Sequence, residues 1–281
     1  MLDRYTDDRF SVLMPVHNRA DIFFLFDRAV ESVFNNTILP KELVLVVDGP
    51  LEAAFKEKIQ NLTSCYPIRV IWLPQNEGII YALNKGLANI DTQWTMRADA
   101  DDLNFPKRFQ LQIQVLEQGY DLVGGAIEEV EPSGELIAVK YSPEDEASIR
   151  KYIRYRNPFN HMTVAFVTKI AKEVGGYPNL ALKEDYGLWS LFLKRGAKVA
   201  NLRDILVGAT TGRAMYARRG CWASIKSEIR LQQHLIKCGV QSRVLGAVVA
   251  LMRISLLALP ASALSNFYMC FLRNHFQNRD K

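Results

Sequence analysis

Three carboxylates stand within four residues, at Asp99, Asp101 and Asp102, directly after the apolar run Trp94-Thr95-Met96. Like charges this close together destabilise a folded protein unless a cation lies beside them. In an extended segment, residues two apart point to the same side, so the side chains of Asp99 and Asp101 converge. Carboxylate oxygens bind hard divalent cations, which also bind phosphate. The stretch therefore predicts a metal and phosphate site; the alternative is an acidic loop in which Asp102 or Asn104 is the N-cap of a helix that begins near Pro106.

The elements around this stretch are expected to bring other polar groups to the same place. Predicted strands and helices alternate along the first hundred residues, with strands at 10–16, 43–47, 68–73 and 93–98 and helices at 21–34, 52–62 and 78–88. This alternation is typical of βαβ units in a parallel sheet, where ligands bind beyond the carboxyl ends of the strands. His17-Asn18 and Asp48-Gly49 fall at such ends, as does the aspartate stretch. The coincidence predicts a nucleotide-binding half.

The middle of the chain is less regular. Its pattern predicts helices at 106–118, 143–154 and 184–194 and strands at 122–131, 136–141 and 162–167. The loop from Asn157 to His161 precedes the last of these strands, and its histidine is either a metal or phosphate contact or a loop residue with its own partners. Glu184 and Asp185 open the third helix, where the helix dipole by itself favours acids.

The last seventy residues differ in charge from the rest. Between Arg213 and Lys281 there are 11 Lys or Arg against two acids, a net charge of +9, whereas the whole chain carries +5 and residues 1–212 therefore −4. Helix is expected over 221–237, and residues 244–272 carry one charge, Arg253. We predict a main domain over 1–212 and a basic, apolar helical extension over 213–281. Contact with a membrane interface is favoured for the extension; the alternatives are packing on the domain or on a second subunit, and a true membrane span.

Composition narrows the class of protein. An apolar share of 49% and a charged share of 23% are those of a globular chain and argue against disorder. The four cysteines show no disulfide or metal spacing and indicate a reducing compartment, and the four histidines are too scattered for a zinc site. The polar, acidic start over residues 1–9 is unlike a secretory signal. We therefore expect a cytoplasmic protein, and no nucleic-acid partner.

Five motifs in order resemble those of glycosyltransferase family 2, the inverting sugar transferases of the GT-A fold. They are Val12 to Asn18, Leu45 to Gly49, Asn76-Glu77-Gly78 followed by Ala82, Asn84 and Gly86, Arg97 to Asp102, and Glu184-Asp185. The resemblance covers about residues 10–210 and is nearest to bacterial transferases that build O-antigen or exopolysaccharide units. It departs from the family at Val47, where a first aspartate is usual before Asp48. It implies an α/β fold with a mixed, mostly parallel sheet and flanking helices.

The resemblance also implies roles for residues. The donor site would be formed by Pro15, His17, Asn18, Asp48, Asn76, Gly78, Arg97 and Asp99. Asp48 would accept a hydrogen bond from the uracil N–H, which favours UDP, although a turn aspartate before Gly49-Pro50 is the alternative. Mn²⁺ or Mg²⁺ would be held by Asp99, Asp101 and His161. Asp185 would be the catalytic base, with Glu184 orienting the acceptor or the base.

Some of these residues have structural alternatives. Asn76 could cap the helix that Gly78 begins, and Arg97 could be half of a structural ion pair. Asn84 and Gly86 are predicted to be packing residues within that helix.

The whole pattern predicts an inverting, metal-dependent transferase at the cytoplasmic face of the inner membrane. It would move a sugar from a nucleotide diphosphate, with UDP favoured, to a lipid-linked saccharide, and the extension could also mediate a homodimer. One alternative is a nucleotidyltransferase, for which the segment from Pro15 to Arg19 lacks the expected glycine- and lysine-rich loop. The other is a catalytically silent scaffold that binds a nucleotide or a membrane.

Overall fold

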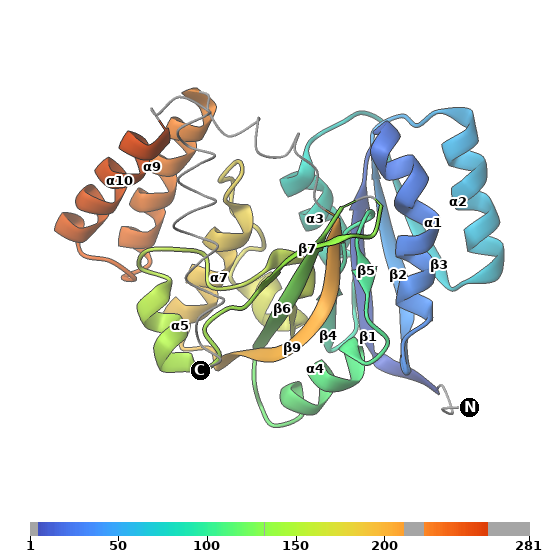
Figure 1. Cartoon of the computed structure of the whole chain (residues 1–281), viewed down its shortest axis with the longest axis horizontal. Helices are drawn as coiled ribbons and strands as arrows, with labels where there is room; N and C mark the ends of the chain where they lie inside the picture. The colour runs from blue at the N-terminus through green and yellow to red at the C-terminus, as the bar shows by residue number, and fades with distance from the viewer. Residues whose placement is uncertain (1–4, 132, 211–221, 258–281) are drawn as a thin grey trace.

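The structure is a computed structural model and describes residues 5–131, 133–210 and 222–257 (Figure 1). Its strands are β1 (Tyr5–Val16), β2 (Ile38–Asp48), β3 (Ile68–Leu73), β4 (Trp94–Arg97), β5 (Leu103–Asn104), β6 (Leu122–Val130), β7 (Leu136–Lys140), β8 (Ala165–Val167) and β9 (Val199–Thr210). Its helices are α1 (Ala20–Phe34), α2 (Ala53–Cys65), α3 (Ile79–Ala88), α4 (Arg108–Leu116), α5 (Glu146–Tyr152), α6 (Thr168–Glu173), α7 (Glu184–Lys194), α9 (Trp222–Lys237) and α10 (Arg243–Leu257), with a 3₁₀ turn η1 (His161–Thr163).

The described strands form one nine-stranded sheet in the order β3-β2-β1-β4-β8-β6-β9-β5, with β7 added beside β6. Strands β3, β2, β1 and β4 are mutually parallel, whereas β8 is antiparallel to both β4 and β6. The carboxyl ends of β1, β2 and β4 therefore lie at one edge of the sheet. The polar groups that the sequence predicts for the site directly follow these ends. The predicted mixed, mostly parallel α/β architecture is confirmed at this half.

Alternate residues of the inner strands enter two separate cores. Val12 and Met14 of β1 pack in a core with Phe26 of α1, and Leu13 packs on the opposite face with Leu83 of α3. Helices on both faces explain why residues 10–16 of β1 and 43–47 of β2 are apolar at nearly every position, as expected for parallel strands buried on both sides.

The sequence pattern missed two strands and a helix. β9 was not predicted because Arg203 and Asp204 interrupt its apolar residues, and the strand is irregular there, with register shifts against β6. β5 is two residues long and α6 six, too short to leave a periodic signal. β1 begins at Tyr5 rather than Phe10, and its polar start is held by Asp7, which accepts a hydrogen bond from Arg9 N at 2.9 Å.

Part of the predicted extension belongs to the core of the domain. Leu231 and Leu235 of α9 join the core that contains α7, and Ser227 Oγ of α9 donates to the carbonyl of Ala181 just before α7. Helix α10 packs on α9 at the edge of the molecule opposite α1 and α2 (Figure 1). No helix in the described part of the chain is long and apolar enough to cross a membrane. Residues 213–221 and 258–281 of the predicted extension lie outside the described residues.

Candidate active site

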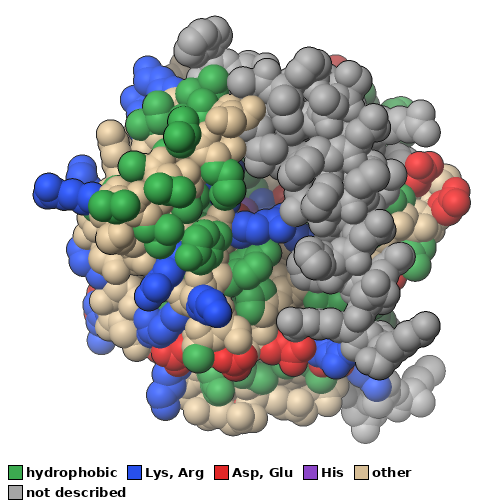
Figure 2. All heavy atoms as spheres, turned by 60° about the vertical axis from the view of Figure 1, so that its left-hand side comes forward, with side chains coloured by type: hydrophobic (Ala, Val, Ile, Leu, Met, Phe, Trp, Pro, Cys, Tyr) green, Lys and Arg blue, Asp and Glu red, His purple; other side chains and the backbone are tan. Residues whose placement is uncertain are grey.

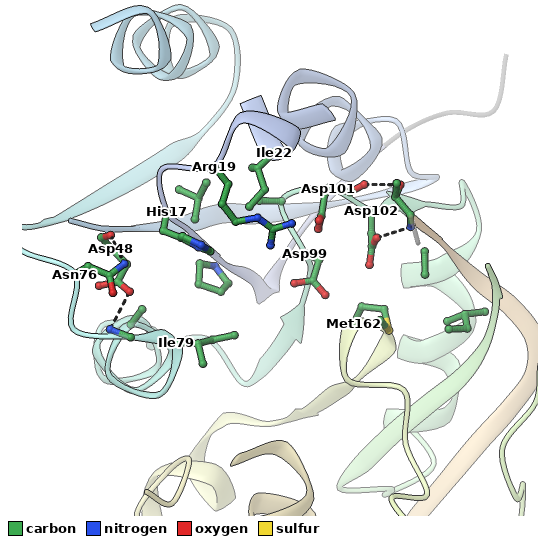
Figure 3. A pocket seen from close by; sticks show the side chains of 18 of the residues that line it. His17, Arg19, Ile22, Asp48, Asn76, Ile79, Asp99, Asp101, Asp102 and Met162 are labelled. Carbon is green, nitrogen blue, oxygen red and sulfur yellow. Dashed lines mark hydrogen bonds between the residues drawn. The ribbon is translucent and has the colours of Figure 1, made fainter. Parts of the chain in front are cut away.

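A cavity of about 520 Å³ opens beyond the carboxyl ends of β1, β2 and β4. It brings together seven of the predicted site residues, which are Pro15, His17, Asp48, Asn76, Gly78, Asp99 and Asp101. Figure 3 shows His17 and Arg19 lying between Asp48 on one side and Asp101 on the other. The cavity is thus a single site assembled from segments as far apart in sequence as Pro15 and Thr210.

The loop after β4 is held in place from two sides. The backbone N–H of Ala98 donates to the carbonyl of Leu13 at 3.0 Å, which fixes the start of the loop on β1. Thr210, the last residue of β9, donates its N–H to Asp102 Oδ1 and its hydroxyl to the carbonyl of Asp101, both at 2.8 Å. Asp102 is therefore a structural residue of the loop. It is not a helix cap, because α4 begins at Arg108 with Lys107 before it.

The carboxylates of this loop repel one another. Burial and the neighbouring charge of Asp99 raise the pKa of Asp101 to about 6, and burial with the same neighbour raises the pKa of Asp102 well above its ordinary value. Arg97 lies beneath them, 1% exposed, and forms an ion pair with Asp99. Arg19 also lowers the pKa of Asp101, but it is itself paired with Asp21, so the carboxyls keep an excess of negative charge that favours a further cation.

The donor set fits a divalent cation in part. Asp99 and Asp101 supply two carboxylates facing the cavity, the ligands that Mg²⁺ and Mn²⁺ accept alongside phosphate oxygens. Among the described residues no group of three His, Cys, Asp or Glu is arranged to hold a metal. Two protein carboxylates are enough where the diphosphate of a substrate completes the coordination.

His161 does not line the cavity that these carboxylates face. Its Nε2 is 3.2 Å from the hydroxyl of Tyr177, and its ring packs edge-on against Trp189. Burial lowers its pKa well below the ordinary value, so the ring is neutral. The metal role predicted for His161 is not supported by this position, because the loop turns the ring toward the aromatic core; Met162, the next residue, lines the cavity instead.

Asp48 supports the loop that leads into α3. Its Oδ1 accepts the N–H of Glu77 at 2.7 Å and its Oδ2 accepts the N–H of Gly78 at 3.0 Å, while Asn76 donates to the Asp48 carbonyl at 3.2 Å. Each carboxylate oxygen has a second lone pair for a ligand. The predicted capping of α3 by Asn76 is wrong, since the N-cap is Gly78, at φ 88°, with no side-chain hydrogen bond.

The acids predicted for catalysis begin α7, and neither lines the cavity itself. Asp185 Oδ1 accepts the N–H of Tyr186 at 2.7 Å, and Oδ2 accepts a hydrogen bond from Asn157 at 2.6 Å. Burial raises the pKa of Asp185, and burial and then the charge of Asp185 raise the pKa of Glu184 to about 7. Arg97 lowers both pKa values, so one buried guanidinium influences both the aspartate loop and the start of α7.

Several contributors were not predicted from the sequence. Arg19 and Lys140 line the cavity, and Asn157 holds Asp185. Arg19 stands two residues beyond the predicted His17, a signal that was available, whereas Lys140 and Asn157 come from distant segments with no local pattern. Conversely, Asn18 does not line the cavity, although both of its chain neighbours do.

The packing prediction holds for one of two residues in α3. A Cβ on Gly86 would lie 2.2 Å from Leu13 Cδ1, so α3 lies directly on β1 there. Asn84 does more than pack. It donates to the carbonyl of Tyr177 and accepts the N–H of the same residue, both at 2.8 Å, and so ties α3 to the loop before α7.

Comparison with known proteins agrees with this arrangement. The sequence profile described as Glycosyl transferase family 2 matches residues 11–172. An uncharacterised glycosyltransferase of Haemophilus influenzae is 35% identical over 94% of this chain and 99% of its own length. The amylovoran biosynthesis glycosyltransferase AmsE of Erwinia amylovora is 31% identical over 92% of this chain and 97% of its own.

A third relative has a stated reaction. The Escherichia coli enzyme named UDP-Gal:alpha-D-GlcNAc-diphosphoundecaprenol beta-1,3-galactosyltransferase is 31% identical over 94% of this chain and 97% of its own. Among solved structures, S. aureus TarS 1–349 in complex with UDP-GlcNAc superposes with a TM-score of 0.65 at 15% identity, covering 97% of this chain and 76% of that one. At that identity the likeness establishes a shared GT-A fold.

Proposed function

Because this chain is a glycosyltransferase that belongs to family 2, we propose that it transfers a sugar with inversion from UDP to a lipid-linked saccharide of a surface polysaccharide. The supporting observation is the cavity that gathers Asp48, Asp99 and Asp101 beyond the ends of parallel strands. The relative that uses UDP-Gal and a diphosphoundecaprenol acceptor supports both the nucleotide and the acceptor class.

The residues divide the work of donor binding. Asp48 keeps the loop of residues 76–78 beside the cavity and has lone pairs free to accept from the uracil N–H. Arg19 and Lys140 place positive charge on the cavity wall, where the diphosphate is held. When bound by Asp99 and Asp101, Mn²⁺ or Mg²⁺ supplies Lewis-acid stabilisation of the charge that develops on the leaving diphosphate.

Asp185 is the proposed base. The acceptor hydroxyl oxygen attacks the anomeric carbon from the side opposite UDP and gives its proton to Asp185, and the bond between that carbon and the UDP oxygen breaks with its electron pair leaving on the phosphate. The pKa of Asp185 is raised by burial, which strengthens its carboxylate as a proton acceptor. Glu184, with a pKa of about 7, lies next to it to orient the acceptor or the base.

The test compares wild type with Asp185→Asn, using UDP-galactose first and then other UDP-sugars, and an undecaprenyl-diphosphate-linked GlcNAc as acceptor. We expect kcat to fall at least about 10²-fold, with the dissociation constant of UDP unchanged. Transfer that persists in Asp185→Asn would show that another group is the base. Transfer by the wild type from GDP- or TDP-sugars in preference to UDP-sugars would overturn the choice of nucleotide.

We also propose that the enzyme works as a peripheral protein on the cytoplasmic face of the inner membrane, where a lipid-linked acceptor lies. The basic balance of residues 213–281, at +9, supports attraction to anionic lipid.

A further inference from the structure

The outer face of α10 is apolar and exposed. Val244, Val248, Leu251 and Met252 are 76%, 58%, 70% and 51% exposed. Their spacing of four, three and one residues places all four on one side of the helix. A continuous exposed stripe of this kind marks a contact surface more often than scattered single residues do.

The inner face of α10 carries the charge. Arg253 is the one charged residue between Val244 and Leu257, and its Nη1 lies 3.1 Å from both carboxylate oxygens of Glu228 on α9. The Glu228 side chain is 3% exposed, and Lys183 Nζ lies 3.7 Å from it. A helix on the surface of a soluble domain turns its charged residues outward, whereas here Arg253 faces α9 beside the buried Val249, and the outer face beyond Arg243 is apolar. The outer face of α10 is therefore built for a surface other than water.

The exposed charges around this stripe are positive. Residues 222–257, the α9–α10 hairpin, contain five Lys or Arg and one acid, the buried Glu228. The exposed cations are Lys226, Arg230, Lys237 and Arg243. Figure 2, which brings this side of the molecule forward, shows hydrophobic side chains gathered together with Lys and Arg around them. Two copies of the hairpin would bring like charges together, whereas an anionic surface would attract them.

We propose that the outer face of α10 docks on an anionic lipid bilayer, with the apolar stripe entering the interface and the cations contacting lipid headgroups. The inference adds to the proposed membrane location by naming the surface that makes the contact. It rests on the proposed function, because the lipid-linked acceptor is the reason for that contact. Helix α9 joins the hairpin to the site, because Ser227 donates to Ala181 and His234 Nε2 lies 3.2 Å from the carbonyl of Gly187. Docking thus fixes the start of α7, with Asp185, relative to the bilayer that carries the acceptor.

The test is sedimentation of the full chain with vesicles of phosphatidylglycerol and phosphatidylethanolamine, compared with vesicles of phosphatidylcholine alone. We expect the wild type to bind the anionic vesicles and to be partly released by high salt, since screening weakens the contribution of the cations. The double variant Val248→Asp, Leu251→Asp should lower the partition coefficient at least about tenfold. A matched control adds the same two charges to α2 at the exposed Gln60→Asp and Asn61→Asp, and should bind as the wild type does.

Three results would overturn the inference. One is equal vesicle binding by the wild type and the α10 double variant. Another is a wild-type dimer in analytical ultracentrifugation that the α10 variant converts to monomer, with no vesicle binding by either, which would assign the stripe to a second copy. The third is equal binding to anionic vesicles by Arg230→Glu, Lys237→Glu and by the wild type.

The proposed function fails in a different way. A wild type that binds vesicles but transfers no sugar to any lipid-linked or short soluble acceptor would leave the docking surface standing and reject the transferase assignment. The α10 double variant should retain transfer to a short soluble acceptor, because its substitutions lie outside the cavity.

Discussion

Asn157 Nδ2 donates a hydrogen bond of 2.6 Å to Oδ2 of Asp185, and so joins a loop to the first turn of a helix 28 residues later. The side-chain oxygen Oδ1 of Asn157 accepts the N–H of Phe159 at 3.2 Å, which fixes the orientation of the amide. Because both carboxylate oxygens of Asp185 accept hydrogen bonds, its side chain populates few rotamers, and this favours a single direction of proton transfer.

Asn157→Ala should therefore lower kcat by about tenfold or more and leave the KM for the donor little changed. Because the Asn157 hydrogen bond lowers the pKa of Asp185, its removal should move the acid limb of the kcat profile to higher pH. The measurement is kcat against pH for both proteins. A lower kcat with an unshifted profile would show that Asn157 only supports the loop.

Glu184 makes the free energy of unfolding depend on pH. Its pKa is raised from an ordinary 4.5 to about 7 by burial and by Asp185, so the folded state holds the proton more tightly than the unfolded state. The contribution of this proton to the free energy of unfolding is fully present below about pH 4.5 and is lost as the pH rises through 7. Glu184→Gln should remove this loss and stabilise the protein on the order of 2 kcal/mol at pH 8. Urea unfolding at pH 5 and pH 8 measures it; an equally steep pH dependence in the variant would contradict it.

Asp101→Ala tests whether Asp101 binds the metal ion. UDP with Mn²⁺ should stabilise the wild type by about 2.7 kcal/mol at a hundredfold excess over the dissociation constant, and the variant should lose most of this gain. Thermal unfolding with UDP, with and without Mn²⁺, is the measurement. Asp91→Ala is the control, since the Asp91 side chain is 89% exposed and its ion pair with Lys172 is 3.6 Å long. A metal-dependent gain that survives in Asp101→Ala would move the metal site elsewhere.

Gly86→Ala should destabilise the fold by about 1 to 3 kcal/mol. The new Cβ would lie 2.2 Å from Leu13 Cδ1 and 2.9 Å from Val46 Cγ2, both in the core beneath α3. Chemical denaturation gives the change, and Lys85→Ala, on the exposed side of the same helix, should be neutral within about 0.5 kcal/mol. A stable Gly86→Ala would mean that α3 can shift on the sheet.

The sequence was sufficient for the donor side of the site because strand ends and their polar residues are local in sequence. Asp48 follows a continuous apolar run and Asp99 follows the short strand β4, and a parallel sheet brings such ends together by its topology alone. Glu184 and Asp185 were placed on the correct helix because these acids and the apolar residues of the helix that they begin are adjacent in sequence.

Features that depend on contacts between distant segments could not be predicted in this way. The sequence around His161 is equally consistent with a ligand or a core ring, and the choice depends on Tyr177 and Trp189, which arrive from later in the chain. Asn157 and Lys140 reach the site through packing of the second half. The reversed polarity of α10 was hidden as well, because sequence alone does not say which side of a helix faces α9.

The double hydrogen bond between Asn84 and Tyr177 has a consequence for engineering this enzyme. Exchanging the donor-binding half with that of a relative, in order to change the sugar, would replace α3 while leaving the loop before α7. Unless an asparagine is kept at position 84, the chimera would lose both hydrogen bonds. Helix α7, which carries the proposed base, would then shift relative to the new donor. Residue 84 therefore belongs with the second half of the protein in any exchange, even though it lies in the first.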